Sequence, residues 1–180
     1  MPYFLKDNAT FAGISVNKIN VTGRTELLKE AITQYNSYDS KDWEKSYFDK
    51  FSGGYIVANK QRIEHSNTSK NEKAKFEKEI SMSKIFAKTG YKIEMLEEMP
   101  RIPSPDIKID GLLADLKSVS SHNNIVKDAK KAVRKQGAEI VLFEFEKETK
   151  EIYIEIKKLL RMGIHGMYYF TGRESKIHIF

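Results

Sequence analysis

The stretch that decides the fold is PDIKIDGLLADLK, Pro105–Lys117, in which two short apolar runs flank Asp110-Gly111. An Asp-Gly pair between alternating residues is the strongest short signal for a β-hairpin with a two-residue turn. This turn places Asp106 opposite Asp115, with their Cβ atoms about 5 Å apart. A slip by one residue would destroy the apolar face, so the sequence specifies this register well.

The two faces of this hairpin differ in chemistry because side chains alternate along a strand. One face is apolar and is expected in the core: Ile107, Ile109, Leu112, Ala114 and Leu116. The other carries Asp106, Lys108, Leu113, Asp115 and Lys117. Opposed carboxylates repel, and a divalent cation with oxygen ligands would relieve the repulsion, since Mg²⁺ needs only one or two protein carboxylates. The alternative is a solvated face whose lysines offset the aspartates.

The patterns around the hairpin predict a mixed α/β domain. A capping box, Ser69 to Glu72, opens a helix that reaches about Lys88 and is closed by Gly90. Alternating residues then predict a strand over 91–96. After the hairpin we expect a helix over 123–136, a strand over 138–145, a helix over 150–162, and strands over 166–170 and 176–180. From residue 69 the order is α-β-β-β-α-β-α-β-β, around one sheet.

The first third of the chain gives weaker signals. Apolar spacing predicts a short helix over 25–35, and the stripe of Trp43, Tyr47, Phe48 and Phe51 predicts another, stopped by Gly53-Gly54. Residues 55–58 resemble a strand, and the polar residues 59–70 a linker. We therefore expect a small, mostly helical N-terminal extension with its linker over 1–68, and the main domain over 69–180.

Composition limits the function classes. The chain has 180 residues, 40% of them hydrophobic, a formal net charge of +6 and no cysteine. A core can form, a polyanionic partner is favoured, and disulfides, thiolate metal sites and cysteine nucleophiles are excluded. No signal peptide or membrane span is recognisable, so we expect action in a cytoplasm-like compartment without a membrane partner. Delivery as part of a larger effector stays open.

Two helices carry further candidates. Glu79 lies about 60° from Phe76, at the edge of the core-facing stripe, where a carboxylate is costly without a partner. It either snorkels at the rim or becomes a third ligand if its helix packs beside the hairpin. In the helix over 123–136, five cations share the side opposite the core stripe and could grip phosphates, unless they form an ordinary solvated face: Lys127, Lys130, Lys131, Arg134 and Lys135. Before this helix, Ser118, Ser120 and His122 suit phosphate contacts.

Together these motifs resemble the PD-(D/E)XK nuclease superfamily. The resemblance runs from about Ser69 to Phe145 and uses Glu79, the Pro-Asp of Asp106, and the Ala-Asp-Leu-Lys of Asp115 and Lys117. Residues 90–145 also resemble the C-terminal tRNase domains of contact-dependent growth-inhibition toxins and related nuclease domains of phage and mobile elements. Asp106 and Asp115 are closer in sequence than is usual for the superfamily, and the N-terminal third is not covered.

The resemblance implies a restriction-endonuclease-like αβββαβ core with a mixed central sheet, extended here by a C-terminal helix and two strands. It implies a metal-dependent nuclease acting on RNA, tRNA in particular, with one or two Mg²⁺ or Mn²⁺ ions held by Asp106, Asp115 and Glu79. Lys117 would orient the attacking water or stabilise the transition state. The basic helix would bind nucleic acid, and Gln136 resembles an extra residue that some families place near the site. A cognate immunity protein is the implied protein partner.

Two alternatives stay open. A metal-independent RNase of the barnase/EndoU/colicin/RelE-like type would use Lys117, Ser118, Ser120, His122 and Arg134, with Asp115 structural. A protein that has kept the fold but lost catalysis would be a nucleic-acid-binding or partner-binding module. The remaining histidines show no metal-ligand spacing and are interpreted as structural or solvated: His65, His165 and His178.

Overall fold

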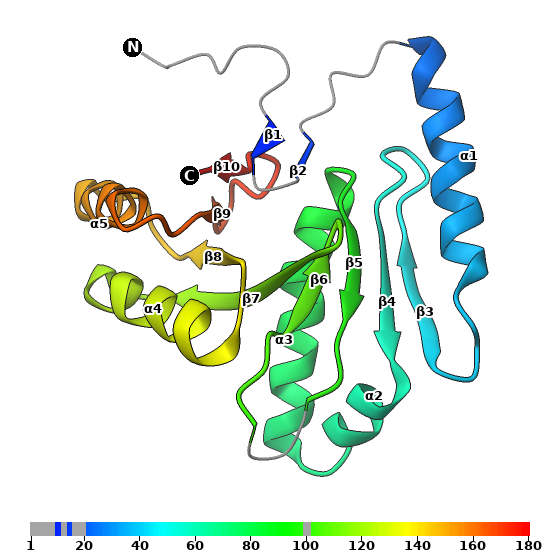
Figure 1. Cartoon of the computed structure of the whole chain (residues 1–180), viewed down its shortest axis with the longest axis horizontal. Coiled ribbons are helices and arrows are strands. Elements are labelled where there is room, and N and C mark those ends of the chain that lie inside the picture. The colour runs from blue at the N-terminus through cyan, green and yellow to red at the C-terminus, as the bar shows by residue number, and fades with distance from the viewer. Residues whose placement is uncertain (1–9, 12–13, 16–20, 99–101) are drawn as a thin grey trace.

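The computed structural model describes residues 10–11, 14–15, 21–98 and 102–180 (Figure 1). The helices of this part are α1 (Val21–Ser37), α2 (Lys60–Ser66), α3 (Lys70–Lys88), α4 (Ile125–Gln136) and α5 (Lys150–Arg161), with a 3₁₀ turn, η1 (His122–Asn124), before α4. The strands are β1 (Thr10–Phe11), β2 (Ile14–Ser15), β3 (Trp43–Phe48), β4 (Tyr55–Asn59), β5 (Lys92–Met95), β6 (Ile107–Ile109), β7 (Leu112–Val119), β8 (Ile140–Phe145), β9 (Gly166–Phe170) and β10 (His178–Ile179).

Eight of these strands form one mixed sheet in the order β10-β9-β8-β7-β6-β5-β4-β3. The pairs β4/β5, β7/β8 and β8/β9 are parallel, and the other neighbours are antiparallel. The expected α/β class with a mixed central sheet is therefore confirmed. The sheet is wider than the sequence predicted, because β3 and β4 extend it beyond β5 (Figure 1).

The central hairpin has the predicted register. Ile107 pairs with Ala114, Lys108 with Leu113, and Ile109 with Leu112. Both turn residues have positive φ, 46° at Asp110 and 87° at Gly111, as a two-residue turn of this kind requires. The apolar face of the hairpin lies in the core as expected, so the charged residues of the hairpin lie on the opposite face of the sheet.

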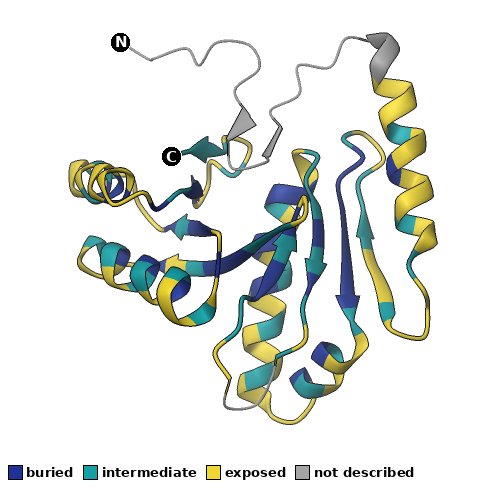
Figure 2. Ribbon diagram, viewed as in Figure 1, coloured by how far each residue is buried: buried dark blue, intermediate teal, exposed yellow. Residues whose placement is uncertain are grey.

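Two hydrophobic cores cover the two faces of the sheet. In β8, Ile140 and Leu142 join the core that contains Met82 and Phe86 of α3. Val141, Phe143 and Phe145 point the other way and join the core that contains residues of α4 and α5. Thus α3 packs on one face, and α4 and α5 on the other. Figure 2 shows this layering, with buried central strands and exposed outer faces on α4 and α5.

The helix boundaries around the hairpin follow the predicted caps. The Ser69 side chain accepts a hydrogen bond from the Glu72 backbone N–H, which satisfies one donor of the first turn of α3. Gly137 ends α4 with φ of 75°, the left-handed conformation that glycine adopts without a Cβ penalty. Both helices bring side chains to the candidate site.

Two predictions for the N-terminal third are wrong. Residues 43–48 form the edge strand β3 rather than a helix, because they pair with β4 while Trp43 packs on Tyr38 and Phe48 on Tyr35. The stripe spacing also suited a helix, and tertiary packing decided between the two. The region predicted as a linker contains α2, whose side chains include the fully buried Arg62.

The predicted helix over 25–35 lies within α1, and the predicted strand over 55–58 lies within β4. The sequence-based division at residue 69 stays a prediction, although strands from both sides of it share one sheet. Within the described ranges, no helix has both the length and the apolar character needed to cross a membrane.

Candidate functional site

The hairpin places Asp106 directly before β6 and Asp115 in the middle of β7. The Leu116 backbone N–H donates to Asp106 Oδ2 over 2.9 Å, and the Leu96 N–H donates to the Asp106 carbonyl over 3.0 Å. These two bonds hold Asp106 between the end of β5 and the middle of β7. Both carboxylates are buried, and Asp115 has no exposed surface at all. The hairpin register and the alternation of side chains along its strands were enough to predict that these two carboxylates lie close together.

Asp115 has partners on both of its oxygens. Its Oδ2 forms an ion pair with Lys117, and its Oδ1 accepts a hydrogen bond of 2.8 Å from Gln136 Nε2. The Lys117 side chain keeps 19% of its surface exposed, so its ammonium lies at the boundary between the buried carboxylate and solvent. Gln136 lies in the last turn of α4, and its contact ties the basic helix to the acidic centre.

Burial and a like charge shift the acidity of Asp115. The pKa of this carboxyl is raised to about 7, mainly by desolvation and secondly by the nearby Asp106 carboxylate, while Lys117 opposes both effects. An aspartate that holds its proton near neutral pH is one whose negative charge is poorly compensated. A bound cation would compensate that charge directly.

Glu79 is buried rather than snorkelling at the rim. Its Oε2 lies 2.6 Å from Arg62 Nη2, and the Arg62 guanidinium stacks over the Phe76 ring with 5.1 Å from Cζ to the ring centroid. Burial and, secondly, the Asp106 charge raise the pKa of Glu79 to about 7, while Arg62 lowers it. Glu79 and Asp106 therefore lie close enough to act on each other electrostatically, as the sequence predicted for α3.

Glu98 completes a cluster that sequence analysis missed. Carboxylate oxygens of Glu79, Glu98 and Asp106 lie within 4.8 Å of one another, a spacing and donor type that fit a hard cation. Glu98 also pairs with Lys75 and lies 3.4 Å from Arg62 Nη1. Asp115 is not part of this trio. We refer to Glu79, Glu98, Asp106 and Asp115 together as the acidic centre.

The missed residues had weak sequence signals. Arg62 lies in a seven-residue helix without apolar periodicity, and Glu98 follows β5 at the start of a proline-rich stretch. One signal for α2 was present, because the Asn59 side chain caps it by accepting from the Gln61 N–H. A buried arginine cannot be recognised from that cap alone.

The predicted nucleic-acid contacts are only partly available in this conformation. Four of the five α4 cations are exposed and Lys130 is half-buried. Among the described residues, none of the five takes part in an ion pair. Ser118, in contrast, donates to Glu144 Oε1 over 2.8 Å. The free cations of α4 are thus the better candidates for phosphate contacts.

Residues of the metal-independent alternative are divided between two places. Ser120 and His122 line a small cavity of about 170 Å³ together with Lys147 and Thr149. Neither Lys117 nor Arg134 is among the residues that line this cavity, and Lys117 pairs with Asp115 instead.

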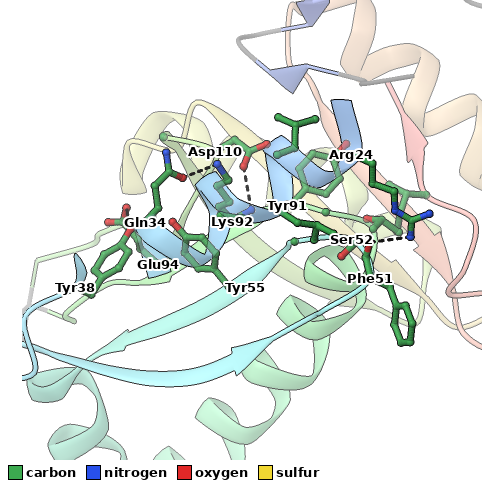
Figure 3. Close-up of a pocket in the computed structure, with 18 of the residues that line it drawn as sticks. Arg24, Gln34, Tyr38, Phe51, Ser52, Tyr55, Tyr91, Lys92, Glu94 and Asp110 are labelled. Carbon is green, nitrogen blue, oxygen red and sulfur yellow. Dashed lines mark hydrogen bonds between the residues drawn. The ribbon is translucent and has the colours of Figure 1, made fainter. Parts of the chain in front are cut away.

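A larger pocket, of about 1030 Å³, lies away from the acidic centre, between α1, the start of β5 and the hairpin turn (Figure 3). Its polar groups already hold one another: Tyr38 donates to Glu94, Lys92 Nζ to Gln34, and Arg24 to the Phe51 carbonyl. Beside the acidic centre, by contrast, Arg62 Nε and Gln136 Oε1 are buried and form no hydrogen bond with the described residues. Unsatisfied buried groups point to a functional site, so the acidic centre is the better candidate.

The acidic centre therefore lies beside a lysine that keeps part of its side chain exposed and beside a basic helix. Residues 103–171, which run from before β6 to the end of β9, match the family described as the contact-dependent growth inhibition CdiA C-terminal domain. The fold is similar to a chain of the CdiA-CT/CdiI toxin and immunity complex from Burkholderia pseudomallei, with 17% identity and a TM-score of 0.44, covering 56% of this chain and 82% of that one. No curated protein matches the chain.

The predicted resemblance to growth-inhibition toxin domains is thus confirmed for the stretch that contains Asp106, Asp115, Lys117 and α4. The matched stretch does not include Arg62 or Glu79. The assignment to the PD-(D/E)XK superfamily stays a prediction.

Proposed function

We propose that the protein is a metal-dependent nuclease that hydrolyses phosphodiester bonds with Asp106, Asp115 and Lys117. The observation that carries this proposal is the hairpin register, which places two buried carboxylates side by side with a lysine of the same face. The contact of Asp115 with Gln136 brings a helix of unpaired cations to the same place. Carboxylates for a cation, an ammonium group and a phosphate-binding surface are the components that phosphodiester hydrolysis requires.

The chemistry divides among these groups. A bound Mg²⁺ or Mn²⁺ would polarise the phosphate and lower the pKa of a bound water. Asp106 and Asp115 would supply hard oxygen donors for it, and a cation between them would offset their mutual repulsion. Lys117 reaches solvent and can leave Asp115 when a cation arrives. Its ammonium is then free to orient the attacking water or to stabilise negative charge on the phosphate.

The substrate proposed is RNA, and tRNA in particular, which rests on the similarity of residues 103–171 to growth-inhibition toxin domains. The same similarity supports a cognate immunity protein as partner. This part is tested by expressing the chain in cells with and without its neighbouring gene. Growth arrest that the neighbouring gene relieves supports the toxin role, and normal growth in both cases contradicts it.

The nuclease proposal is tested by incubating the purified chain with labelled tRNA, unstructured RNA and DNA, with Mg²⁺ or with a chelator. We expect cleavage that the chelator and Asp115→Asn abolish and that Asp42→Asn, an exposed control, leaves intact. Cleavage that survives the chelator would support the metal-independent alternative instead. Binding without cleavage under any divalent ion would support a non-catalytic module.

A further inference from the structure

Arg62 is a cation built into the acidic centre. Its side chain has no exposed surface, and its guanidinium contacts Glu79 over 2.6 Å and Glu98 over 3.4 Å. The Phe76 ring supports it from one side. Two of the three carboxylates in the trio Glu79, Glu98 and Asp106 are therefore engaged by one buried side chain from α2.

The charges of the centre divide into two groups. Arg62 and Lys75 together offset Glu79 and Glu98, since Lys75 pairs with Glu98 and lies 3.8 Å from Glu79. Among the described residues, the cation paired with Asp115 is Lys117, and Asp106 forms no ion pair of its own. A single divalent ion would match the charge of the two aspartates and release Lys117 for the substrate. Each carboxylate of the first group thus already contacts a cationic side chain at the place where a second ion would bind.

A guanidinium is also a poor neighbour for a metal ion. Arginine keeps its charge at any accessible pH and presents its donors in a rigid fork. A divalent ion bound to Glu79 would lie within a few ångströms of that charge in a medium of low dielectric constant, where repulsion is strong. Moving Arg62 aside would break its bond to Glu79 and leave a buried arginine unpaired.

From this arrangement we propose that Arg62 occupies the position that a second cation would take. The centre then binds one metal ion, at Asp106 and Asp115. Glu79 is a positioning residue rather than a ligand. The resemblance to the nuclease superfamily, in contrast, implies one or two ions and makes Glu79 a ligand. The inference rests on the proposed metal-dependent function, and it assigns to α2 a role in setting the metal stoichiometry.

The test is a titration of the full chain with Mn²⁺ alone, without substrate. Calorimetry and electron paramagnetic resonance of the free ion measure how many ions bind and how tightly. The wild type is expected to bind one ion. Asp115→Asn should weaken this binding at least tenfold, whereas Glu79→Gln should change it less than threefold. Two ions in the wild type, or equal losses in the two variants, would overturn the proposal. A wild type that binds no Mn²⁺ contradicts the metal-dependent function itself, so the two failures are distinguishable.

Removing the arginine gives a second, independent readout. Arg62→Met should expose the charges of Glu79 and Glu98 and create a second Mn²⁺ site, and Arg62→Lys should keep one. An unchanged count of one in a folded Arg62→Met protein contradicts the proposal. If that variant does not fold, the double variant Arg62→Met with Glu79→Gln removes the buried charge together with its partner. The double variant should bind one ion with wild-type affinity, and a tenfold loss there would show that Glu79 is a ligand.

Discussion

Two ion pairs, each with a buried acid that the charge of Asp106 affects, differ in how they meet solvent. Arg62 and Glu79 join α2 to α3, and the arginine is wholly enclosed. Lys117 and Asp115 are two residues apart in β7, and the lysine keeps 19% of its side chain exposed. Both acids have a pKa raised to about 7, chiefly by burial, so the environment of the carboxylates is alike and the cations make the difference.

The difference separates a structural pair from a reactive one. The enclosed guanidinium cannot leave Glu79 without rearranging two helices, whereas Lys117 can turn to solvent without disturbing the strand. The first pair therefore fixes the shape of the centre, and the second can exchange its partner for a metal ion and a phosphate. The variants below break one pair at a time.

The largest effect is expected from the reactive pair. Lys117→Met should lower the rate of RNA cleavage at saturating substrate by about 10³-fold, because the variant loses transition-state stabilisation at the phosphate. Single-turnover cleavage of labelled RNA measures it. Lys157→Met on α5, an exposed lysine of the same type, should remain within twofold of the wild type. A Lys117→Met loss below tenfold would assign the lysine a structural role only.

The enclosed pair should dominate stability instead. Arg62→Met leaves Glu79 buried without its partner, which costs about 3–5 kcal/mol of unfolding free energy. Lys117→Met should cost less than half as much, since water can still reach this pair. Urea denaturation at pH 8 in chelator gives both values. Equal losses of unfolding free energy in the two variants would contradict the expected difference between the enclosed pair and the pair that water can reach.

The raised acidities predict how stability depends on pH. The pKa of Asp115 is about 7 in the folded protein and 3.8 without its environment. Between these values the folded state keeps a proton that the unfolded state has lost, so this group lowers stability as pH rises from about 4 to 7. Metal-free wild type should therefore lose more unfolding free energy between pH 5.5 and 8 than Asp115→Asn. Added Mg²⁺ should restore the unfolding free energy that the wild type loses at pH 8. If the unfolding free energies of the two proteins change in parallel with pH, the raised pKa is not that of Asp115.

A smaller effect is expected outside both pairs, on α4. Replacing Lys131 or Arg134 by Gln should weaken binding of RNA a few-fold and about equally for all sequences, because phosphate contacts carry no sequence information. Each lost contact should reduce the slope of log affinity against log salt by about 0.7 to 0.9. Filter binding by the inactive Asp115→Asn protein measures this slope. Lys157→Gln, on the neighbouring helix, should leave it unchanged.

The parts of the site that were predictable are those that local rules determine. The Asp-Gly turn and the alternation of Ile107 to Leu116 fix which residues face which way, and the Ser69 cap fixes where α3 begins. From these, the closeness of Asp106, Asp115 and Lys117 follows without any tertiary information. The exposed cations of α4 follow from helical periodicity in the same way.

The remainder depends on contacts between distant segments. The aromatic spacing of residues 43–51 suits a helix, and only pairing with β4 makes it a strand. Arg62 is polar and lies among polar residues, so its burial is evident only when α2 packs on α3. Because the pair of Arg62 and Glu79 forms only when these helices pack together, the sequence alone does not show that Glu79 has a partner.

The chemistry of the cleaved ends tests the central claim most directly. RNA digested by the wild type in Mg²⁺ should carry 5′-phosphate and 3′-hydroxyl ends, and no cleavage should occur in the chelator, because Asp106, Asp115 and Lys117 would direct a water at the phosphate. Ends bearing 2′,3′-cyclic phosphate, formed equally well in the chelator, would show that the 2′-hydroxyl is the nucleophile and would contradict the account.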